Sequence, residues 1–138
     1  MIAIGSDHAG LNLKKAIIKR LEELNIEYKD FGTYTPDSTD YPKYAQAVAE
    51  AVANGECEKG IITCGTGIGV SIAANKVKGI RAAICHDVFS AKACREHNDA
   101  NILTMGERVI GLGAAIEVLN AWLGTEFLGG RHDRRYRN

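Results

Sequence analysis

Short runs of apolar residues alternate along this chain with longer stretches in which apolar residues recur every three or four positions. The apolar runs predict five strands, at residues 2–4, 26–31, 60–64, 81–85 and 101–105. The periodic stretches predict helices at residues 13–24, 44–52, 88–96 and 114–123, and a further helix that ends at Asn75. This alternation is typical of a parallel sheet with helices on both faces. We therefore predict one doubly wound α/β domain over residues 1–138, although the pattern does not reveal the strand order.

Two segments of the N-terminal half have distinctive patterns. The first helix has an apolar stripe made of Leu13, Ile17, Leu21 and Leu24. Its other face carries charged side chains that we expect to be exposed: Lys14, Lys15, Lys19, Glu22 and Glu23. Residues 32–42 contain both prolines and are expected to form a long loop, of a kind that often serves function.

Composition and charge narrow the class of protein. The 138 residues are 46% hydrophobic and 25% charged, which excludes a disordered chain. The 17 Lys and Arg residues balance 17 Asp and Glu residues, so no global field attracts nucleic acid or an anionic membrane. No apolar stretch reaches the ~20 residues that cross a bilayer, and the N-terminus lacks a signal-peptide pattern. We expect a cytoplasmic protein that binds neither nucleic acid nor membrane.

The cysteines and histidines do not follow metal-binding spacings. None of the four cysteines belongs to a C-x-x-C pair, and the four histidines show no zinc-site pattern. We therefore expect free thiols and no metal ion. Cys57, Cys85 and Cys94 lack chemically active neighbours in the sequence, so we expect them to be packing residues.

Polar and chemically capable residues follow the predicted strands. They are Ser6-Asp7-His8, Gly32-Thr33, Cys64 with the loop after it, His86-Asp87 and Gly106-Glu107-Arg108. In doubly wound sheets, ligands bind beyond the carboxyl ends of the strands. The sequence therefore predicts an active site at this edge of the sheet.

The glycine loop, residues 65–69, has glycine at every second position just before a predicted helix. Successive backbone N–H groups of such a loop can converge on an anion, either a phosphate or a developing enolate. Val70 stands where the dinucleotide fingerprint has its third glycine, which weakens that interpretation, although Asp87, about 20 residues on, keeps it open. The alternative is a tight strand–helix turn that binds no ligand.

Two further groups near the strand ends allow a chemical or a structural interpretation. Cys64 precedes a helix N-terminus, where a thiol can become a base or nucleophile, but a cysteine that ends a buried strand is more often a small apolar residue. Asp7 and His8 can move protons near neutral pH. Asp7 can also cap the first helix, and both uses are compatible.

The same ambiguity holds toward the C-terminus. His97 lies at the end of a predicted helix, where an imidazole can be functional or can simply be favoured by the helix dipole. Arg131 and Arg135 are four residues apart, so a helix would place both guanidinium groups on one face and let them bind a phosphate. The alternative is a solvated basic tail.

Several motifs extend over the whole chain: Asp7-His8-Ala9-Gly10, Gly32-Thr33, Thr39-Asp40-Tyr41-Pro42, Cys64-Gly65-Thr66-Gly67-Ile68-Gly69, Ser71-Ile72-Ala73-Ala74-Asn75-Lys76, Arg95-Glu96-His97-Asn98, Gly106-x-Arg108 and Gly129-Gly130-Arg131-His132. In this combination and order they resemble ribose-5-phosphate isomerase, type B, of the sugar-phosphate isomerase family that also includes the galactose-6-phosphate isomerase subunits. The resemblance implies reversible isomerisation of D-ribose 5-phosphate to D-ribulose 5-phosphate, in the pentose phosphate pathway, without metal or organic cofactor. It also implies a Rossmann-like three-layer α/β/α sandwich with a five-stranded parallel sheet, assembled as a homodimer or a pair of dimers.

The resemblance further implies roles for single residues. Thr66 and His97 would open the furanose ring, Cys64 would move the proton from C2 to C1 through a cis-enediolate, and Asp7 would bind the substrate hydroxyls. Loop amides would hold the enediolate oxygen, in the segment Gly65, Thr66, Gly67, Ile68 and Gly69. The phosphate would bind to His8, Arg108, Arg131 and Arg135, while Tyr41 and Asn98 would line the sugar. His97 and Asn98 would reach Cys64 of the partner subunit.

Two features depart from the family pattern. Val70 stands where some members have a carboxylate base, so Cys64 is the base carried over here. The chain stops at Asn138, where relatives often have a longer C-terminal helix, and this bears on how firmly Arg135 is anchored. For the dimer contact, the helix at residues 114–123 with Trp122, followed by Phe127 and Leu128, offers apolar surface.

Two other functions remain open beside isomerisation of a pentose phosphate. The same chemistry with a longer pocket would serve a hexose 6-phosphate, for example allose 6-phosphate. A non-enzymatic protein that senses a phosphate or nucleotide would use the glycine loop and Asp87. Such a sensor has no need for Cys64, His97 and Asp7 together at the ends of strands and helices.

Overall fold

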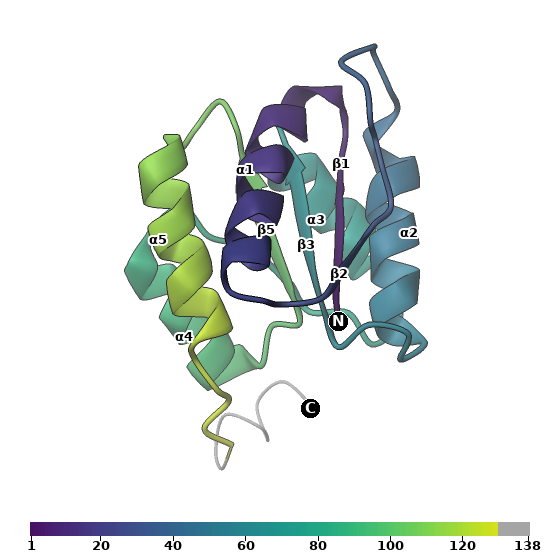
Figure 1. The fold of residues 1–138 in the computed structure, drawn as a ribbon. Helices are drawn as coiled ribbons and strands as arrows, with labels where there is room; N and C mark the ends of the chain where they lie inside the picture. The colour runs from purple at the N-terminus through teal and green to yellow at the C-terminus, as the bar shows by residue number, and fades with distance from the viewer. Residues whose placement is uncertain (130–138) are drawn as a thin grey trace.

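The computed structural model describes residues 1–129. They form a five-stranded parallel sheet with the order β2-β1-β3-β5-β4. The strands are β1 (Ile2–Ser6), β2 (Tyr28–Asp30), β3 (Lys59–Cys64), β4 (Ala82–Ile84) and β5 (Ile102–Gly106). The helices are η1 (His8–Gly10), α1 (Leu11–Glu23), α2 (Tyr41–Ala53), α3 (Ile68–Asn75), α4 (Val88–Asn98) and α5 (Leu112–Leu123). Helices flank the sheet on both sides, which confirms the predicted α/β fold class (Figure 1).

The core has two halves, one on each face of the sheet. On one face, Ile4 and Ile61 pack with buried residues of α1, α4 and α5, including Trp122. On the other face, Ala3 and Ile62 pack with α2 and α3, whose buried residues are mostly small. Successive residues of a strand point to opposite faces, so a strand that is apolar throughout fills both halves.

The predicted helices and strands all occur, with ends displaced by a few residues. The largest change is at α2, which begins at Tyr41 with Pro42 in its first turn rather than at residue 44. Proline is compatible with this position because the first N–H groups of a helix have no partner within the helix. The helix stops at Asn54, followed by Gly55 with a φ of 85°, as the sequence predicts. Across residues 1–129, each helix is too short or too polar to cross a membrane.

Two expectations for the first helix were wrong. Lys14, predicted to be exposed, has a relative exposure of 1%. Its ammonium donates to both carboxylate oxygens of Asp30, at 2.8 and 3.0 Å, and to the carbonyl of Thr33. A carboxylate at the end of β2 and a carbonyl from the chain after it thus compensate the buried charge. Leu24, predicted in the apolar stripe, is 38% exposed because the helix ends at Glu23 and the chain turns away.

A crevice opens where the helices leave neighbouring strands toward opposite faces. The chain passes from β1 into α1 on one face, and from β3 into α3 on the other. In an open parallel sheet, this change of side marks the ligand-binding position. The register aligns the strand ends there, with Ser6 beside Thr63 and Cys64 beside Gly106.

Candidate active site

The crevice at the carboxyl ends of β1 and β3 contains a cavity of about 290 Å³. It is lined by Asp7, His8, Ala9, Tyr41, Cys64, Gly65, Thr66, Gly69 and Arg108. All of these except Ala9 are site residues predicted from the sequence. The structure therefore brings together, in one cavity, a thiol, a carboxylate, an imidazole, a guanidinium and two hydroxyl groups.

Cys64 is the last residue of β3, and its side chain is 5% exposed. The Gly67 N–H donates a hydrogen bond to its Sγ at 3.0 Å, which holds the thiol at the start of the glycine loop. Gly67 has a φ of 82°, and a Cβ there would lie 2.9 Å from the carbonyl carbon of Met105. A larger residue could not bring this N–H to the sulfur without displacing the chain.

The glycine loop is partly occupied by its own hydrogen bonds. Besides the Gly67 N–H on the sulfur, the Ile68 N–H donates to Thr66 Oγ1 at 3.2 Å. Two of the five loop amides expected to hold an anion therefore already have partners in the chain. Gly69 serves a steric role, because a Cβ there would lie 2.8 Å from Cζ of the Tyr41 ring. The loop thus admits the tyrosine ring directly against its backbone.

Asp7 and His8 are both held by defined contacts. The Asp7 carboxylate accepts the Gly10 N–H at 3.1 Å and caps η1, so the capping role expected from the sequence is confirmed. His8 Nδ1 accepts the Thr39 N–H at 3.1 Å, and the His8 N–H donates to Thr39 Oγ1 at 3.1 Å. This network assigns the ring proton to Nε2, which can donate to an anion. The long loop therefore orients a site residue, as its length suggested.

The turn between β5 and α5 (Gly106–Arg108) is fastened to the end of β3. The Glu107 N–H donates to the carbonyl of Cys64 at 2.8 Å, and the Arg108 N–H donates to that of Gly65 at 3.1 Å. The Glu107 carboxylate accepts the Leu13 N–H at 2.8 Å in the first turn of α1. Sequence reasoning did not single out Glu107 for this role; its only signal was its position directly after a strand.

His97 and Asn98 are at the opposite edge of the sheet from this cavity. They are the last two residues of α4 and are exposed. The chain then enters β5 at its start, where the Asn101 carbonyl accepts the Gly60 N–H. From Gly60 to Cys64 the strand rises by about 13 Å, at ~3.3 Å per residue. One chain therefore does not bring these two residues to Cys64. Arg131 and Arg135, also predicted for the site, are outside the described residues.

Arg95, the first residue of the Arg95-Glu96-His97-Asn98 motif, secures the C-terminal end of α4. Arg95 is 6% exposed and donates to the carbonyls of Ala100 and Thr125 and to the carboxylate of Asp99, at 2.8 to 3.1 Å. Asp99 itself adopts a left-handed conformation that ends the helix. The guanidinium therefore fixes the point at which α4 presents its last turn.

The residues after β4 carry contacts that sequence reasoning missed. Cys85 and Cys94, taken as isolated packing residues, have their sulfurs 3.7 Å apart, and the hydrogen bond with Cys94 together with burial raises the pKa of the Cys85 thiol. Asp87 caps α4, with its carboxylate accepting the Ser90 N–H at 2.6 Å, which lowers its pKa. The Asp87 carboxylate is therefore used to cap a helix. This argues against the dinucleotide site for which Asp87 was the supporting residue.

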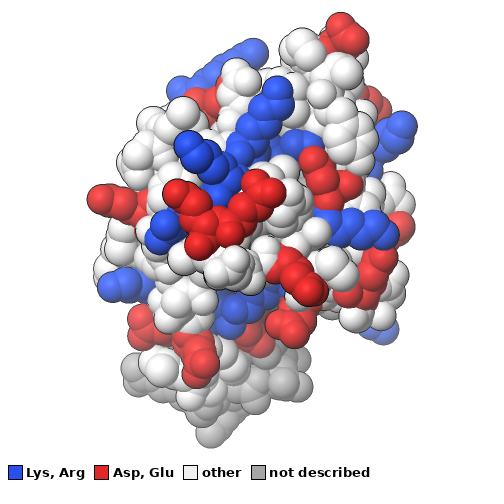
Figure 2. Space-filling model, in the orientation of Figure 1, with Lys and Arg blue, Asp and Glu red and all other residues white. Residues whose placement is uncertain are grey.

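Charge on the described surface is mixed. Figure 2 shows acidic and basic side chains interspersed over the visible face, without a large region of one sign. Within residues 1–129, His, Cys, Asp and Glu side chains form no group of three or more that could hold a metal ion.

The fold and the cavity define a small α/β protein with a thiol, a carboxylate and an imidazole in one cavity at the carboxyl edge of its sheet. A family model described as Ribose/Galactose Isomerase matches residues 2–138, and the chain belongs to this family. Ribose-5-phosphate isomerase B of Escherichia coli is 52% identical over 134 residues, covering 97% of this chain and 90% of that protein. The resemblance inferred from the motifs is confirmed.

Two further comparisons bear on fold and substrate. A solved structure of Clostridium thermocellum ribose-5-phosphate isomerase B has a TM-score of 0.98 and 55% identity, and covers 99% of this chain and 92% of that chain. D-Erythrulose-4-phosphate isomerase 2 of Mycolicibacterium smegmatis is 49% identical over 129 residues, covering 91% of this chain and 85% of that protein. Relatives of similar identity thus act on sugar phosphates of different length.

Proposed function

We propose that this protein interconverts D-ribose 5-phosphate and D-ribulose 5-phosphate without a metal or organic cofactor. The observation that carries the proposal is the buried Cys64 thiol, held by the Gly67 N–H in a cavity that it shares with Asp7, His8, Thr66 and Arg108. Family membership and the identity to ribose-5-phosphate isomerases B support the choice of substrate.

In the proposed reaction Cys64 is the base. As the thiolate, it removes the proton from C2 of the open-chain aldose. The electron pair of that C–H bond forms the C1=C2 bond, and the π pair of the C1=O bond moves to O1, which gives a cis-enediolate. The O2 hydroxyl proton passes to O1 with the help of Asp7, O2 becomes the carbonyl oxygen, and C1 takes the proton back from the Cys64 thiol, which is again a thiolate. A single positioned base of this kind contributes about 10²–10⁴-fold. Amides next to the thiol, those of Gly65 and Thr66, carry the enediolate oxygen, since Gly67 and Ile68 already donate within the chain.

The remaining groups divide the rest of the substrate between them. Asp7 accepts from the sugar hydroxyls, and the Thr66 hydroxyl assists opening of the ring. The phosphate is held by His8 through its Nε2–H and by the guanidinium of Arg108. Arg131 and Arg135, outside the described residues, join them, and Tyr41 packs along the sugar.

The proposed site is completed by a second copy of the chain. His97 and Asn98 are at the amino edge of the sheet, so they serve the cavity of another subunit, where His97 acts with Thr66 in ring opening. Trp122 does not offer the apolar surface expected of it, because that side chain is fully buried in the core, whereas Leu128 beyond the same helix is 66% exposed. β4 is the last strand of the described sheet, and exposed apolar residues lie on it, at the start of α4 and on α3, which packs against β4: Ile68, Ile72, Ile84, Val88 and Phe89. Such a patch beside a free strand edge suits burial against a second copy.

The proposal is tested by incubating the protein with D-ribose 5-phosphate and following D-ribulose 5-phosphate by ¹³C NMR, with and without EDTA. D-Erythrulose 4-phosphate and D-allose 6-phosphate are run in parallel to compare kcat/KM. We expect the pentose phosphate to give the highest value and EDTA to change it by less than about twofold. No conversion of D-ribose 5-phosphate by folded protein, or recovery of an EDTA-inhibited enzyme by a divalent ion, would refute the proposal.

A further inference from the structure

His86 follows β4 and is half-buried outside the cavity described above. Its Nε2 accepts the Gly106 N–H at 2.8 Å, linking the chain after β4 to the carboxyl end of β5. An imidazole nitrogen accepts a hydrogen bond only when it carries no proton. The contact therefore requires a neutral ring with its proton on Nδ1.

Gly106 is the part of the chain on which the glycine loop rests. A Cβ at Gly106 would lie 2.6 Å from the Cα of Thr66, so the two backbones are in direct contact. The next two residues, Glu107 and Arg108, donate their N–H groups to the carbonyls of Cys64 and Gly65. The peptide group held by His86 thus begins the segment that supports the thiol and the loop after it.

We propose that His86 is a positioning residue for the isomerisation, acting through Gly106 on the placement of Cys64 and Thr66. This inference rests on the proposed function of the cavity. His86 does not line the cavity, so it affects the reaction only by fixing the backbone beneath the reacting groups. Small displacements of such groups slow the reaction strongly, because a misplacement of about 1 Å can lower a rate by ~10²-fold.

The charge state of His86 determines whether this support exists. Burial lowers the pKa of His86 below its ordinary value, and Asp87 on the same turn acts in the opposite direction with a smaller effect. On the segment packed against it, the Glu107 carboxylate is turned to the Leu13 N–H and Arg108 lies along the cavity. The neutral ring therefore predominates at neutral pH. As the pH falls through the lowered pKa, the ring gains a second N–H, the bond to Gly106 is lost, and kcat falls.

The test compares two substitutions with different acceptor capacity. Gln at position 86 can place an oxygen near the position of Nε2 without titrating, whereas Leu removes the acceptor. We expect His86→Leu to lower kcat by about tenfold to a hundredfold with KM changed by less than about threefold. His86→Gln should restore kcat to within about threefold of the original and remove the part of the acid limb of the kcat profile that belongs to His86. Leu21→Ala is the control for loss of stability alone, because Leu21 packs in the core near the C-terminal end of α1 and does not line the cavity.

A purely structural role predicts another result. In that case His86→Leu would resemble Leu21→Ala, with a lower melting temperature but an unchanged kcat for the folded fraction, and His86→Gln would leave the acid limb in place. Either result would overturn the inference, whether or not the Leu variant is stable.

A measurement without substrate separates this inference from the proposed function. The Gly106 amide resonance should titrate below the ordinary imidazole range in the original protein, as its acceptor is protonated, and should stop titrating in His86→Gln. If no sugar phosphate is isomerised but this titration is seen, the proposed function is wrong and the contact stands, without its catalytic consequence. If the enzyme is active and Gly106 does not titrate, His86 is not the group that holds it.

Discussion

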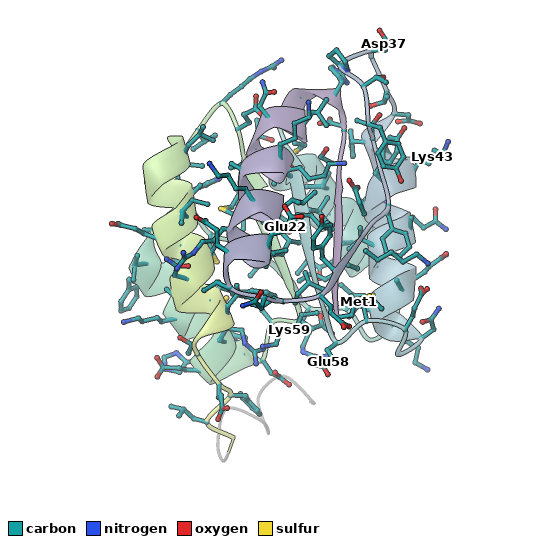
Figure 3. All side chains as sticks on the ribbon, in the orientation of Figure 1. Met1, Glu22, Asp37, Lys43, Glu58 and Lys59 are labelled. Atoms are coloured by element: carbon teal, nitrogen blue, oxygen red, sulfur yellow. The ribbon has the colours of Figure 1, made fainter. Side chains whose placement is uncertain are left out.

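The two edges of the sheet are built from the same strands, yet they carry different chemistry. At the carboxyl edge, helices begin: Asp7 caps η1, Asp87 caps α4, and the glycine loop leads into α3. At the amino edge, helices end: α2 stops at Asn54 and α4 at Asp99. In Figure 3, Asp37 marks the long loop at the first edge, while Met1, Glu58 and Lys59 lie at the second.

This difference follows from parallel topology. Every strand runs the same way, so every connecting helix starts at the carboxyl edge and directs its N–H groups and the positive end of its dipole there. An anionic substrate is therefore favoured at one edge only. The residues of the other edge, His97 and Asn98, can take part in the reaction only through another subunit. Most of the proposed site therefore belongs to the carboxyl edge, and His97 and Asn98 are the part that the amino edge would supply.

The largest expected effect comes from replacing a buried cysteine at the carboxyl edge, and a buried cysteine at the amino edge provides the control. Cys64 at the carboxyl edge and Cys57 at the amino edge are both buried thiols. Cys64→Ala should lower kcat by about 10²–10⁴-fold with little change in phosphate binding, because it removes the base alone. Cys57→Ala should keep kcat within about twofold. Steady-state kinetics with D-ribose 5-phosphate measures both. More than about a tenth of the activity in Cys64→Ala would show that another group is the base.

The assignment of the edges to different subunits is tested by mixing inactive variants. After reversible dissociation, Cys64→Ala and His97→Ala subunits form mixed dimers with one intact and one doubly damaged site. Random pairing makes half of the dimers mixed, so about a quarter of the original activity should return. Mixing Cys64→Ala with Asp7→Asn is the matched control and should return none, since both residues line the same cavity in one chain. Equal recovery in both mixtures, or none in either despite proven exchange, would contradict the shared site.

Two lysines give a smaller effect, on stability. Lys14 is buried and paired with Asp30 near the carboxyl edge, whereas Lys29 is paired with Glu56 at the surface. Lys14→Met leaves a partly buried carboxylate without its cation and should lower the free energy of unfolding by on the order of 3 kcal/mol. Lys29→Met should leave it unchanged within error. Urea unfolding measures both variants, and equal effects would show that the Lys14 pair is not a support of the fold.

The smallest expected effect comes from a methyl group. Gly106→Ala places a Cβ against the Thr66 backbone and should reduce stability by about 1–3 kcal/mol. Gly113→Ala, in the first turn of α5 with nothing within 4 Å of the added atom, should be neutral or slightly stabilising. Thermal unfolding compares them. If Gly106→Ala unfolds at the original temperature, the backbone contact that supports the glycine loop is weaker than described.

Much of this organisation is readable without coordinates. Periodicity located each helix and strand, and the rule for strand ends selected Asp7, Cys64 and Arg108, which do line one cavity. The same reasoning failed for Lys14 and Trp122. A helical pattern shows that a lysine lies off the apolar stripe, but not that a carboxylate from the next strand will receive it. Nor does it distinguish a tryptophan that packs inside from one on the surface.

Local periodicity and the position after a strand were enough to predict the α/β class, the edge of the sheet that holds the cavity and the residues that meet there. The strand order, the placement of His97 and Cys64 at opposite edges, and the contact between His86 and Gly106 became visible only in the folded chain. These depend on which strands become neighbours. That pairing is made between residues far apart in the chain, by packing of two apolar faces that have no local signature.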